Sequence, residues 1–213
     1  MSRIFVFSCV GFSPDGALLN ALSSSRNRFA TQFRRSQMDA ACESTVLAEQ
    51  SHSVALVNLA SVGSPGGSFF AGGQHGPQEC LCTISSLFYS LRRAQQSTIG
   101  RNHIPCNGVV VSPKVDIFRH GISLGYSFRK NVVTLNSVIS MVVSHDKNNA
   151  DLTRSVLRSV FVAAFQNHAE VIVWPNFDPS MQSWISSQIM SFVDGEFRGI
   201  FREIVFCSDV QAT

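Results

Sequence analysis

The sequence predicts an α/β fold with three layers, in which helices cover both faces of a mixed, mostly parallel sheet. Short apolar runs at 54–59, 108–113 and 170–174 have the length and β-branched composition of buried strands. An amphipathic helical pattern spans 149–168. Strands and helices alternate through the second half of the chain, and this order is typical of parallel sheets with helices on both faces.

The composition is that of a folded protein with a small positive charge. Hydrophobic residues make up 45% of the 213 residues and charged residues 15%, which excludes a disordered chain. The net charge of +3 is too small to indicate a nucleic-acid partner, so we expect no DNA binding. No apolar run reaches the roughly 20 residues of a membrane helix, so we expect no membrane association.

The six cysteines include no Cys-x-x-Cys pair. Cys80 and Cys82 would lie about 200° apart around a helix, which is a poor geometry for binding a metal. We therefore expect free thiols in a reducing, intracellular compartment, cytoplasmic or nuclear, with no metal and no cofactor.

The first part of the chain carries weaker patterns. Residues 4–10 are apolar and predict a strand, and 17–22 predict a short helix. Residues 23–36 are polar, basic and without a clear period, so we expect a mobile segment or a long surface loop. Residues 1–37 are treated as an N-terminal extension, of uncertain structure, within a single domain over 1–213.

The other elements are predicted from periodicity and from turn residues. A helix is expected to start within 38–50, with Ser44 or Thr45 as its candidate cap. Later in the chain we expect a polar loop at 94–107, a strand at 108–113 ending at the proline, extended chain at 115–119, a strand within 132–143, a helix at 149–168, a strand at 170–174, a helix at 179–192 and a strand at 202–207.

The centre of the chain has the order strand, glycine loop, helix. The strand covers 54–59, the loop 61–77, and a helix beginning near Gln78 carries apolar residues at helical spacing, namely Leu81, Ile84, Leu87, Phe88 and Leu91. Glycine lets backbone N–H groups approach an anion, and a helix start carries positive charge. This order is therefore typical of a phosphate site, although plain turns can share it. The loop contains neither the Walker motif nor Gly-x-Gly-x-x-Gly.

Three short motifs lie in this stretch. The strand ends in Asn58-Leu59-Ala60-Ser61, the loop contains Pro65-Gly66-Gly67, and the helix opens with Gln78-Glu79. Their order resembles the signature of the bacterial-type poly(ADP-ribose) glycohydrolases, in which Asn-x-Ala-Ser/Asn, Pro-Gly-Gly-Gly and Gln-Glu-Glu follow one another. These proteins are macrodomains, so the resemblance implies a macrodomain-like α/β/α fold.

The resemblance runs from about Glu43 towards the C-terminus. It includes Glu43-Ser44-Thr45-Val46-Leu47-Ala48 before the central strand and Val111-Ser112-Pro113 after it. It is strongest over 58–89, becomes thin after Phe118, and gives no help with the residues before Met38.

The resemblance also implies roles for particular residues. Gly66 and Gly67, with Ser68 in place of the third glycine, would hold the diphosphate of ADP-ribose. Asn58 would lie near the distal ribose, Gln78 and Glu79 would open the helix beneath that ribose, and Phe177 would pack beside it.

The departures from the family pattern concern catalysis. Cys80 stands where the family has the glutamate that protonates the leaving oxygen. A thiol has an ordinary pKa of about 8.5 and is a weak hydrogen-bond donor, so it is a poor general acid. Glu79 is the candidate substitute. Cys80 as a nucleophile assisted by His75 is a further option, and a loop histidine without a function is the simpler interpretation of His75. Pro175 also removes a backbone donor expected near the diphosphate.

The sequence therefore leads to three functional hypotheses. The first is recognition of ADP-ribose or poly(ADP-ribose), with hydrolysis weak or lost because of Cys80. The second is an active ADP-ribosyl glycohydrolase that works through Glu79. The third is a structural or protein-interaction macrodomain with a decayed pocket, for which the partner would be a protein or an assembly.

Overall fold

The computed structural model describes residues 5–8, 16–71, 76–97, 104–105, 107–143 and 149–208. Within these residues, seven strands form one sheet in the order β1-β4-β5-β3-β6-β7-β2. The strands are β1 (Phe5–Ser8), β2 (Gln32–Ser36), β3 (Val54–Leu59), β4 (Gly108–Arg119), β5 (Phe128–Met141), β6 (Val171–Trp174) and β7 (Glu203–Cys207). The pairs β1–β4 and β4–β5 are antiparallel and the others are parallel, which confirms the mixed, mostly parallel sheet.

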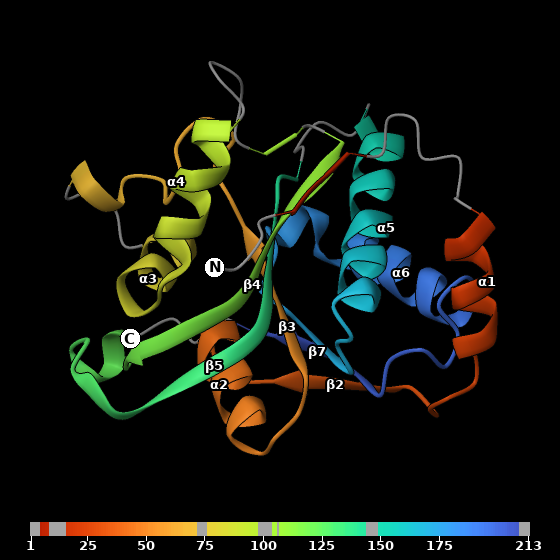
Figure 1. Cartoon of the computed structure of the whole chain (residues 1–213), viewed down its shortest axis with the longest axis horizontal. Coiled ribbons are helices and arrows are strands. Elements are labelled where there is room, and N and C mark those ends of the chain that lie inside the picture. Colours follow the sequence, from red (N-terminus) through yellow and green to blue (C-terminus); the bar gives the residue numbers. More distant parts are fainter. Residues whose placement is uncertain are drawn as a thin grey trace.

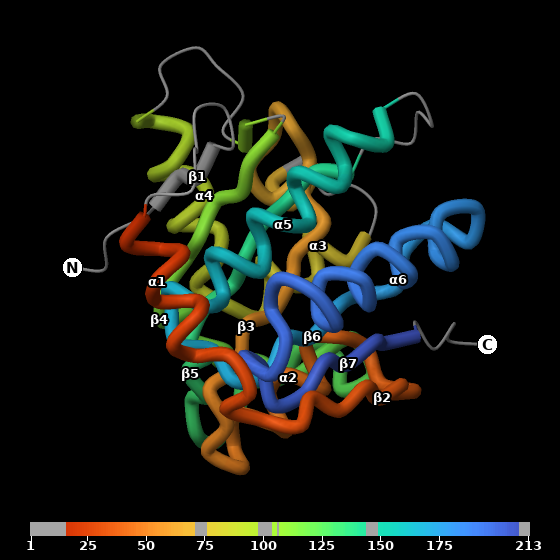
Figure 2. The backbone as a smooth tube through the Cα atoms, turned by 90° about the vertical axis from the view of Figure 1, so that its right-hand side faces the viewer, coloured from red at the N-terminus to blue at the C-terminus, as the bar shows by residue number. Residues whose placement is uncertain are grey.

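Helices cover both faces of this sheet, as predicted (Figure 1). They are α1 (Gly16–Ser25), α2 (Ala40–Glu49), α3 (Pro77–Ile84), α4 (Leu87–Ser97), α5 (Ala150–Gln166) and α6 (Pro179–Asp194), with short 3-10 turns η1 (Phe69–Ala71) and η2 (Ile122–Leu124). One face carries α2, α3 and α4, and the other carries α1, α5 and α6, which lie nearest the viewer in Figure 2. None of the helices in the described ranges is long and apolar enough to cross a membrane.

The alternation of side chains along β3 divides the core into two clusters. Val54 and Leu56 pack with the residues of α3 and α4, while Ala55 and Val57 pack with those of α5 and α6. Because successive side chains of a strand point to opposite faces, a central strand covered on both sides is apolar throughout. This is why 54–59 reads as a continuous apolar run.

The segment 23–36 is not one long loop, which corrects the prediction. Its last five residues form β2, the edge strand that pairs in parallel with β7. The strand is mostly exposed, so it lacks the apolar alternation by which a strand is recognised. Arg34 holds it in place, because the guanidinium lies 2.5 Å from Glu43 on α2 and 2.5 Å from Glu203 on β7.

The helix expected after the glycine loop is two helices. α3 ends before Ser85, whose backbone is extended at φ −138° and ψ 171°. Ser85 pairs with Ile117 of β4, and the Ser86 N–H donates to the Asp116 carbonyl oxygen at 2.9 Å. The helical spacing of apolar residues continues across the break because both helices bury their apolar residues in the same cluster.

Other predicted boundaries also differ from the structure. The loop expected at 94–107 starts later, because α4 continues to Ser97. Asp39 caps α2 by accepting from the N–H groups of Ala41 and Cys42, so neither Ser44 nor Thr45 is the cap. Pro113 does not end its strand, because β4 continues to Arg119. β1 pairs with β4 only up to Val111, so the proline lies in a part of β4 beyond the register with β1, where a missing N–H is tolerated.

Candidate functional site

The candidate site lies where β3 ends and the chain turns through the glycine loop into α3. In open α/β sheets, ligands bind at the carboxyl ends of the parallel strands. Gly66 and Gly67 have φ values of 76° and 60°, the left-handed region that favours glycine. Pro77 stands at the start of α3, where its missing N–H costs nothing.

The carboxylate of Glu79 closes the glycine loop against the start of α3. Its Oε1 accepts a hydrogen bond from the Ser68 N–H at 3.0 Å and another from the Ser68 hydroxyl at 3.1 Å. A Cβ on Gly67 would overlap this carboxylate, and a Cβ on Gly76 would lie 2.6 Å from Oε2. The glycines therefore leave room for the protein's own carboxylate. A loop N–H that could serve a phosphate is bound to Glu79 instead.

Gln78 lies beside Glu79 but is buried. Its Oε1 accepts from the Ser61 N–H at 2.9 Å, which links the end of β3 to the start of α3. Its Nε2 has no hydrogen-bond partner among the described residues. A buried donor without a partner costs about 1–3 kcal/mol, so this amide is suited to donate to an acceptor on a ligand.

Asn58 is held to the sheet on the same face as Val54 and Leu56. Its side chain is buried, and Nδ2 donates to the Ser140 hydroxyl at 3.0 Å across the parallel register of β3 and β5. This contact fixes the orientation of the amide at the strand end that leads into the loop.

Phe177 lies on the opposite face of the sheet, in the cluster with α5 and α6. Its ring lines a cavity of about 150 Å³ at the ends of β3 and β5, together with Leu59, Ala60, Val142, Val143, Asp178, Met181 and Ile185. The Phe177 N–H donates to Gln182 Oε1 at 2.8 Å. Pockets for drug-sized ligands measure about 300–1,000 Å³, so this cavity has room for one ring of a larger ligand.

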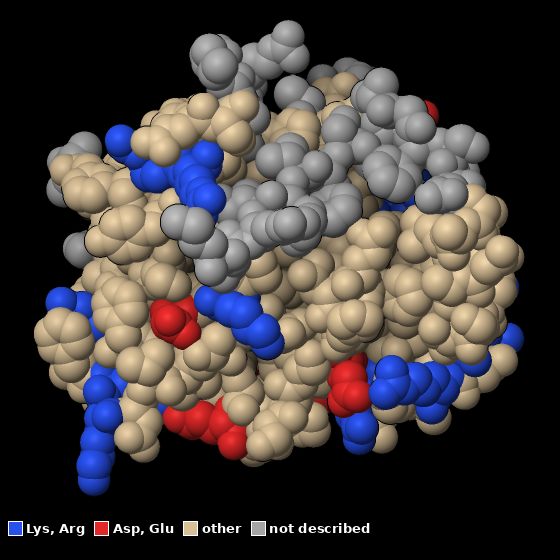
Figure 3. Space-filling view, viewed as in Figure 1, with Lys and Arg blue, Asp and Glu red and all other residues tan. Residues whose placement is uncertain are grey.

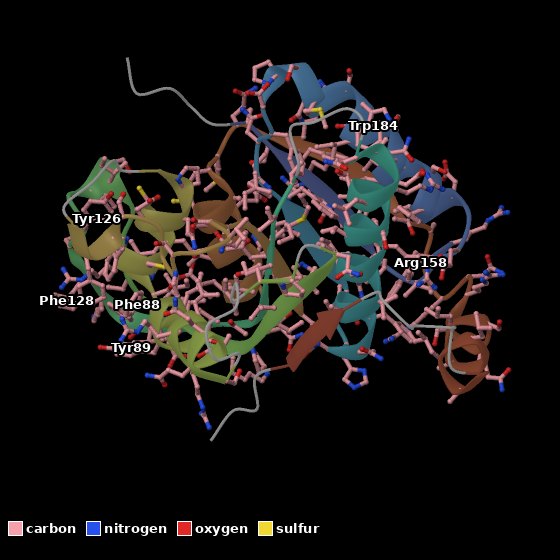
Figure 4. The ribbon with its side chains drawn as sticks, turned by 90° about the horizontal axis from the view of Figure 1, so that it is seen from above. Phe88, Tyr89, Tyr126, Phe128, Arg158 and Trp184 are labelled. Carbon is pink, nitrogen blue, oxygen red and sulfur yellow. The ribbon has the colours of Figure 1, made fainter. Side chains whose placement is uncertain are left out.

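Cys80 points away from Glu79, towards the hairpin between β4 and β5. Its Sγ lies 3.2 Å from the hydroxyl oxygen of Tyr126, which Figure 4 shows at the hairpin end of the molecule. Burial and the contact with Cys80 raise the pKa of Tyr126 to about 12, so the phenol stays protonated at neutral pH. The side chains of Glu79 and Cys80 thus diverge, as neighbouring positions on a helix do.

Four cysteines lie in the described part of the chain, and none of these four forms a disulfide. Cys42, Cys80, Cys82 and Cys207 carry free thiols, and burial followed by the charge of Glu79 raises the pKa of Cys82 to about 12. Within the described ranges, no group of three or more His, Cys, Asp or Glu side chains could hold a metal ion. His75, proposed as a helper of Cys80, lies outside the described residues.

The structure thus brings together Gly67, Ser68, Gln78 and Glu79, while Phe177 and Cys80 face other parts of the molecule. Gly66 packs against Phe88 on the outer side of the loop, since a Cβ there would lie 3.0 Å from that ring. Sequence reasoning missed Tyr126 and Ser140. Neither belongs to a motif, and each contacts its partner from at least 46 residues away along the chain.

Comparisons with known proteins concern the family and the fold of the chain. The family model "Microbial-type PARG, catalytic domain" matches residues 13–120, which is more than half of the chain. The match begins before Met38 and ends at His120, so the family similarity extends further upstream than the motifs indicated. A search of curated proteins found no match.

Solved structures of bacterial poly(ADP-ribose) glycohydrolases (PARG) share the fold. The enzyme from Deinococcus radiodurans in complex with ADP-ribose has a TM-score of 0.74 at 20% identity over 99% of this chain and 88% of that one. The enzyme from Thermomonospora curvata has a TM-score of 0.73 at 20% identity over 99% and 81%. Its complex with the inhibitor ADP-HPD has a TM-score of 0.70 at 20% identity over 99% and 80%. The chain belongs to the microbial-type poly(ADP-ribose) glycohydrolase catalytic-domain family.

Proposed function

We propose that this protein recognises ADP-ribose, or the ends of poly(ADP-ribose), and that its hydrolytic activity is weak or lost. The observation that carries the proposal is the divergence of Glu79 and Cys80 at the start of α3. One carboxylate is bound to the loop, and a thiol stands at the position of the family's general acid.

Retained binding is supported by the polar groups at the end of β3. Asn58 is oriented by Ser140, and the Nε2 of buried Gln78 offers a donor that no described residue accepts. The solved PARG structures that share this fold include complexes with ADP-ribose. The apolar cavity at Phe177 is the right size for one ring of such a ligand.

Weak or lost catalysis is supported by the chemistry of the two candidate acids. General acid catalysis contributes about 10²–10⁴-fold, and the Cys80 thiol is a weak donor whose nearest described partner is the Tyr126 hydroxyl. The Oε1 atom of Glu79 accepts two hydrogen bonds from Ser68, so this oxygen acts as a hydrogen-bond acceptor and not as a proton donor.

A structural or protein-interaction role is favoured by one feature, the hairpin between β4 and β5. Ile122, Leu124, Phe128 and Val132 on this hairpin are all more than half exposed. Exposed apolar groups of this kind are typical of contact surfaces. This role is compatible with ligand recognition, because the hairpin and the strand ends are different parts of the fold.

Calorimetric titration with ADP-ribose tests the proposal. Wild type is expected to bind in the micromolar range. Gln78→Ala is expected to weaken binding about tenfold, since it removes a buried donor to the ligand. Gln50→Ala, which changes an exposed glutamine at the end of α2, is the matched control and should bind as wild type does. Absence of binding by wild type at millimolar ligand would overturn the proposal and leave the interaction role.

A further inference from the structure

A second hollow lies on the outer side of the glycine loop, along α4. It has a volume of about 510 Å³ and is lined by Phe70, Phe88, Tyr89, Arg92, Arg93 and Gln96. We call this the α4 groove. It is larger than the Phe177 cavity, and the proposed function does not use it.

The aromatic rings of the α4 groove are exposed but held in place. Phe70 and Tyr89 are each 75% exposed, the highest values among the large apolar side chains of the described residues. Both rest edge-on against the buried Phe88, with ring centroids 4.6 Å and 6.1 Å from it. A ligand that covers these rings would remove apolar surface from water, which is favourable. Because Phe88 already fixes the rings, they form a preorganised stacking surface.

Two arginines stand beside these rings. Arg92 and Arg93 follow Tyr89 by three and four positions, so their side chains emerge on the same side of α4. Both are exposed, and neither lies within 4.0 Å of a carboxylate among the described residues. In Figure 3 a group of blue atoms lies over α4, and its visible neighbours are tan or grey.

Flat aromatic surface next to guanidinium groups that no described carboxylate pairs with is the chemistry that binds nucleotides. A base stacks on the rings, and phosphate oxygens pair with the arginines. The Arg92 guanidinium lies 6.0 Å from the centre of the Phe88 ring, at the limit of a cation–π contact, so it can turn to a phosphate at little cost. An acidic peptide would use the arginines but would leave Phe70 and Tyr89 without a stacking partner.

The α4 groove adjoins the candidate site through the glycine loop. Gly66 lies against Phe88, and Gln95 Nε2 donates to the Gly63 carbonyl oxygen at 3.4 Å. One side of the loop therefore faces Gln78 and Glu79, and the other side faces the groove. Figure 4 shows Phe88 and Tyr89 at the opposite end of the molecule from Trp184 and Arg158.

We propose that the α4 groove binds a second nucleotide unit of a poly(ADP-ribose) chain whose end occupies the candidate site. The base of that unit stacks on Phe70 and Tyr89, and its diphosphate pairs with Arg92 and Arg93. The inference rests on the proposed function, which supplies the first unit. Nucleic acid is the less suitable occupant, because its binding uses many phosphate contacts and the groove offers two cations.

Fluorescence anisotropy with labelled, size-selected short poly(ADP-ribose), with ADP-ribose as competitor, tests the inference. Wild type is expected to bind the polymer more tightly than ADP-ribose. Tyr89→Ala and the double variant R92A/R93A should each lower affinity for the polymer by about tenfold and leave affinity for ADP-ribose unchanged. Phe128→Ala and Arg35→Ala, an exposed ring and an exposed arginine elsewhere, are the matched controls and should change neither. Circular dichroism confirms that each variant is folded.

The outcomes separate the two proposals. If ADP-ribose binds but the groove variants have the same affinity for the polymer as the control variants, the α4 groove inference is overturned and the proposed function stands. If ADP-ribose does not bind, the proposed function fails, and polymer binding that still requires Tyr89 and the arginines supports the groove alone. If single-stranded oligoadenylate binds as tightly as the polymer and is lost in the same variants, nucleic acid is the occupant and the inference is overturned.

Discussion

Two glutamates that belong to the family motifs, Glu43 and Glu79, have very different surroundings. Glu43 is buried, accepts from Arg34 and Ser36, each at 2.5 Å, and so ties α2 to the edge strand β2. Glu79 is partly exposed, and its carboxylate accepts hydrogen bonds from the backbone N–H and the hydroxyl of Ser68. A glutamate in a family motif can thus serve the stability of the fold or the candidate site, and its hydrogen-bond partners distinguish the two roles.

The two glutamates also differ in whether a bound ligand could affect their hydrogen bonds. The hydrogen bonds of Glu43 come from groups that lie away from the glycine loop, so we expect its removal to weaken the fold alone. The contacts of Glu79 are made by the glycine loop itself, next to the Nε2 of Gln78, for which no described residue is a hydrogen-bond partner. A ligand that enters the loop competes with Glu79 for the Ser68 N–H, so Glu79 connects loop closure to binding.

The largest effect is expected from a third carboxylate, introduced at position 80. If the carboxylate of Cys80→Glu reaches the ligand in place of contacting Tyr126, it supplies the general acid of the family pattern, and we then expect poly(ADP-ribose) hydrolysis to rise by about 10²-fold or more. The rate of ADP-ribose release from the polymer measures it. Cys82→Glu is unsuitable as a control because Cys82 is buried. Cys80→Gln serves instead, because a glutamine side chain has the size of glutamate but no acidic proton. An equal rate for both variants would mean that the loops, and not the acid alone, are altered.

Glu43→Ala should lower the stability of the folded protein. Removing one partner of a buried ion pair costs about 3–5 kcal/mol, and since the Arg34 side chain is 40% exposed we expect about 2 kcal/mol. Thermal denaturation should show a fall in Tm of about 4–8 °C. Glu49→Ala, which removes a glutamate whose side chain is 48% exposed from the same helix, is the control, and it should cost less than Glu43→Ala. Equal losses would show that burial does not distinguish the two pairs.

The contribution of Glu43 should also depend on pH. Burial acts to raise its pKa, but the hydrogen bonds from Arg34 and Ser36 outweigh burial, and the pKa lies below its ordinary value of 4.5. A depressed pKa gives stability that is present above the ordinary value and is lost as pH falls through the folded-state value. The difference in Tm between wild type and Glu43→Gln should therefore be constant near neutral pH and shrink below 4.5. A difference that grows on acidification would contradict this assignment.

Glu79→Gln should have the smallest effect on stability, below about 1 kcal/mol, because its carboxylate is partly exposed and its hydrogen bonds to Ser68 can be kept by an amide oxygen. It should also abolish any hydrolysis that wild type retains. Denaturant unfolding and the release assay, carried out on the same preparation, check the two statements. Hydrolysis that persists in the variant would exclude Glu79 as the acid.

The sequence is informative where the signal is local. The run at 54–59, the glycine loop and the amphipathic pattern of 149–168 correspond to β3, its loop and α5, because each depends on residues close in the chain. The motifs correctly predicted Asn58 at the end of a strand and Gln78 and Glu79 at the start of the helix that follows the loop. The parallel order of the sheet follows from the alternation of strands and helices.

The sequence is uninformative where contacts are long-range. β2 is polar and is held by Arg34 through residues on α2 and β7, so no local period marks it. The break at Ser85 depends on hydrogen bonds to β4, some thirty positions further along the chain. The proximity of Cys80 to Tyr126 depends on the fold of the hairpin and could not be predicted from the motif, which ends at the helix start.

The most direct test of binding without efficient hydrolysis is the chain length of poly(ADP-ribose) after incubation with an excess of wild-type protein. The account predicts that the polymer is bound, as co-migration with the protein would show, and that its length distribution stays unchanged while Cys80→Glu shortens it under the same conditions. Rapid shortening by wild type, equal to that by Cys80→Glu, would contradict the account and show that this chain is an active glycohydrolase without a glutamate at position 80.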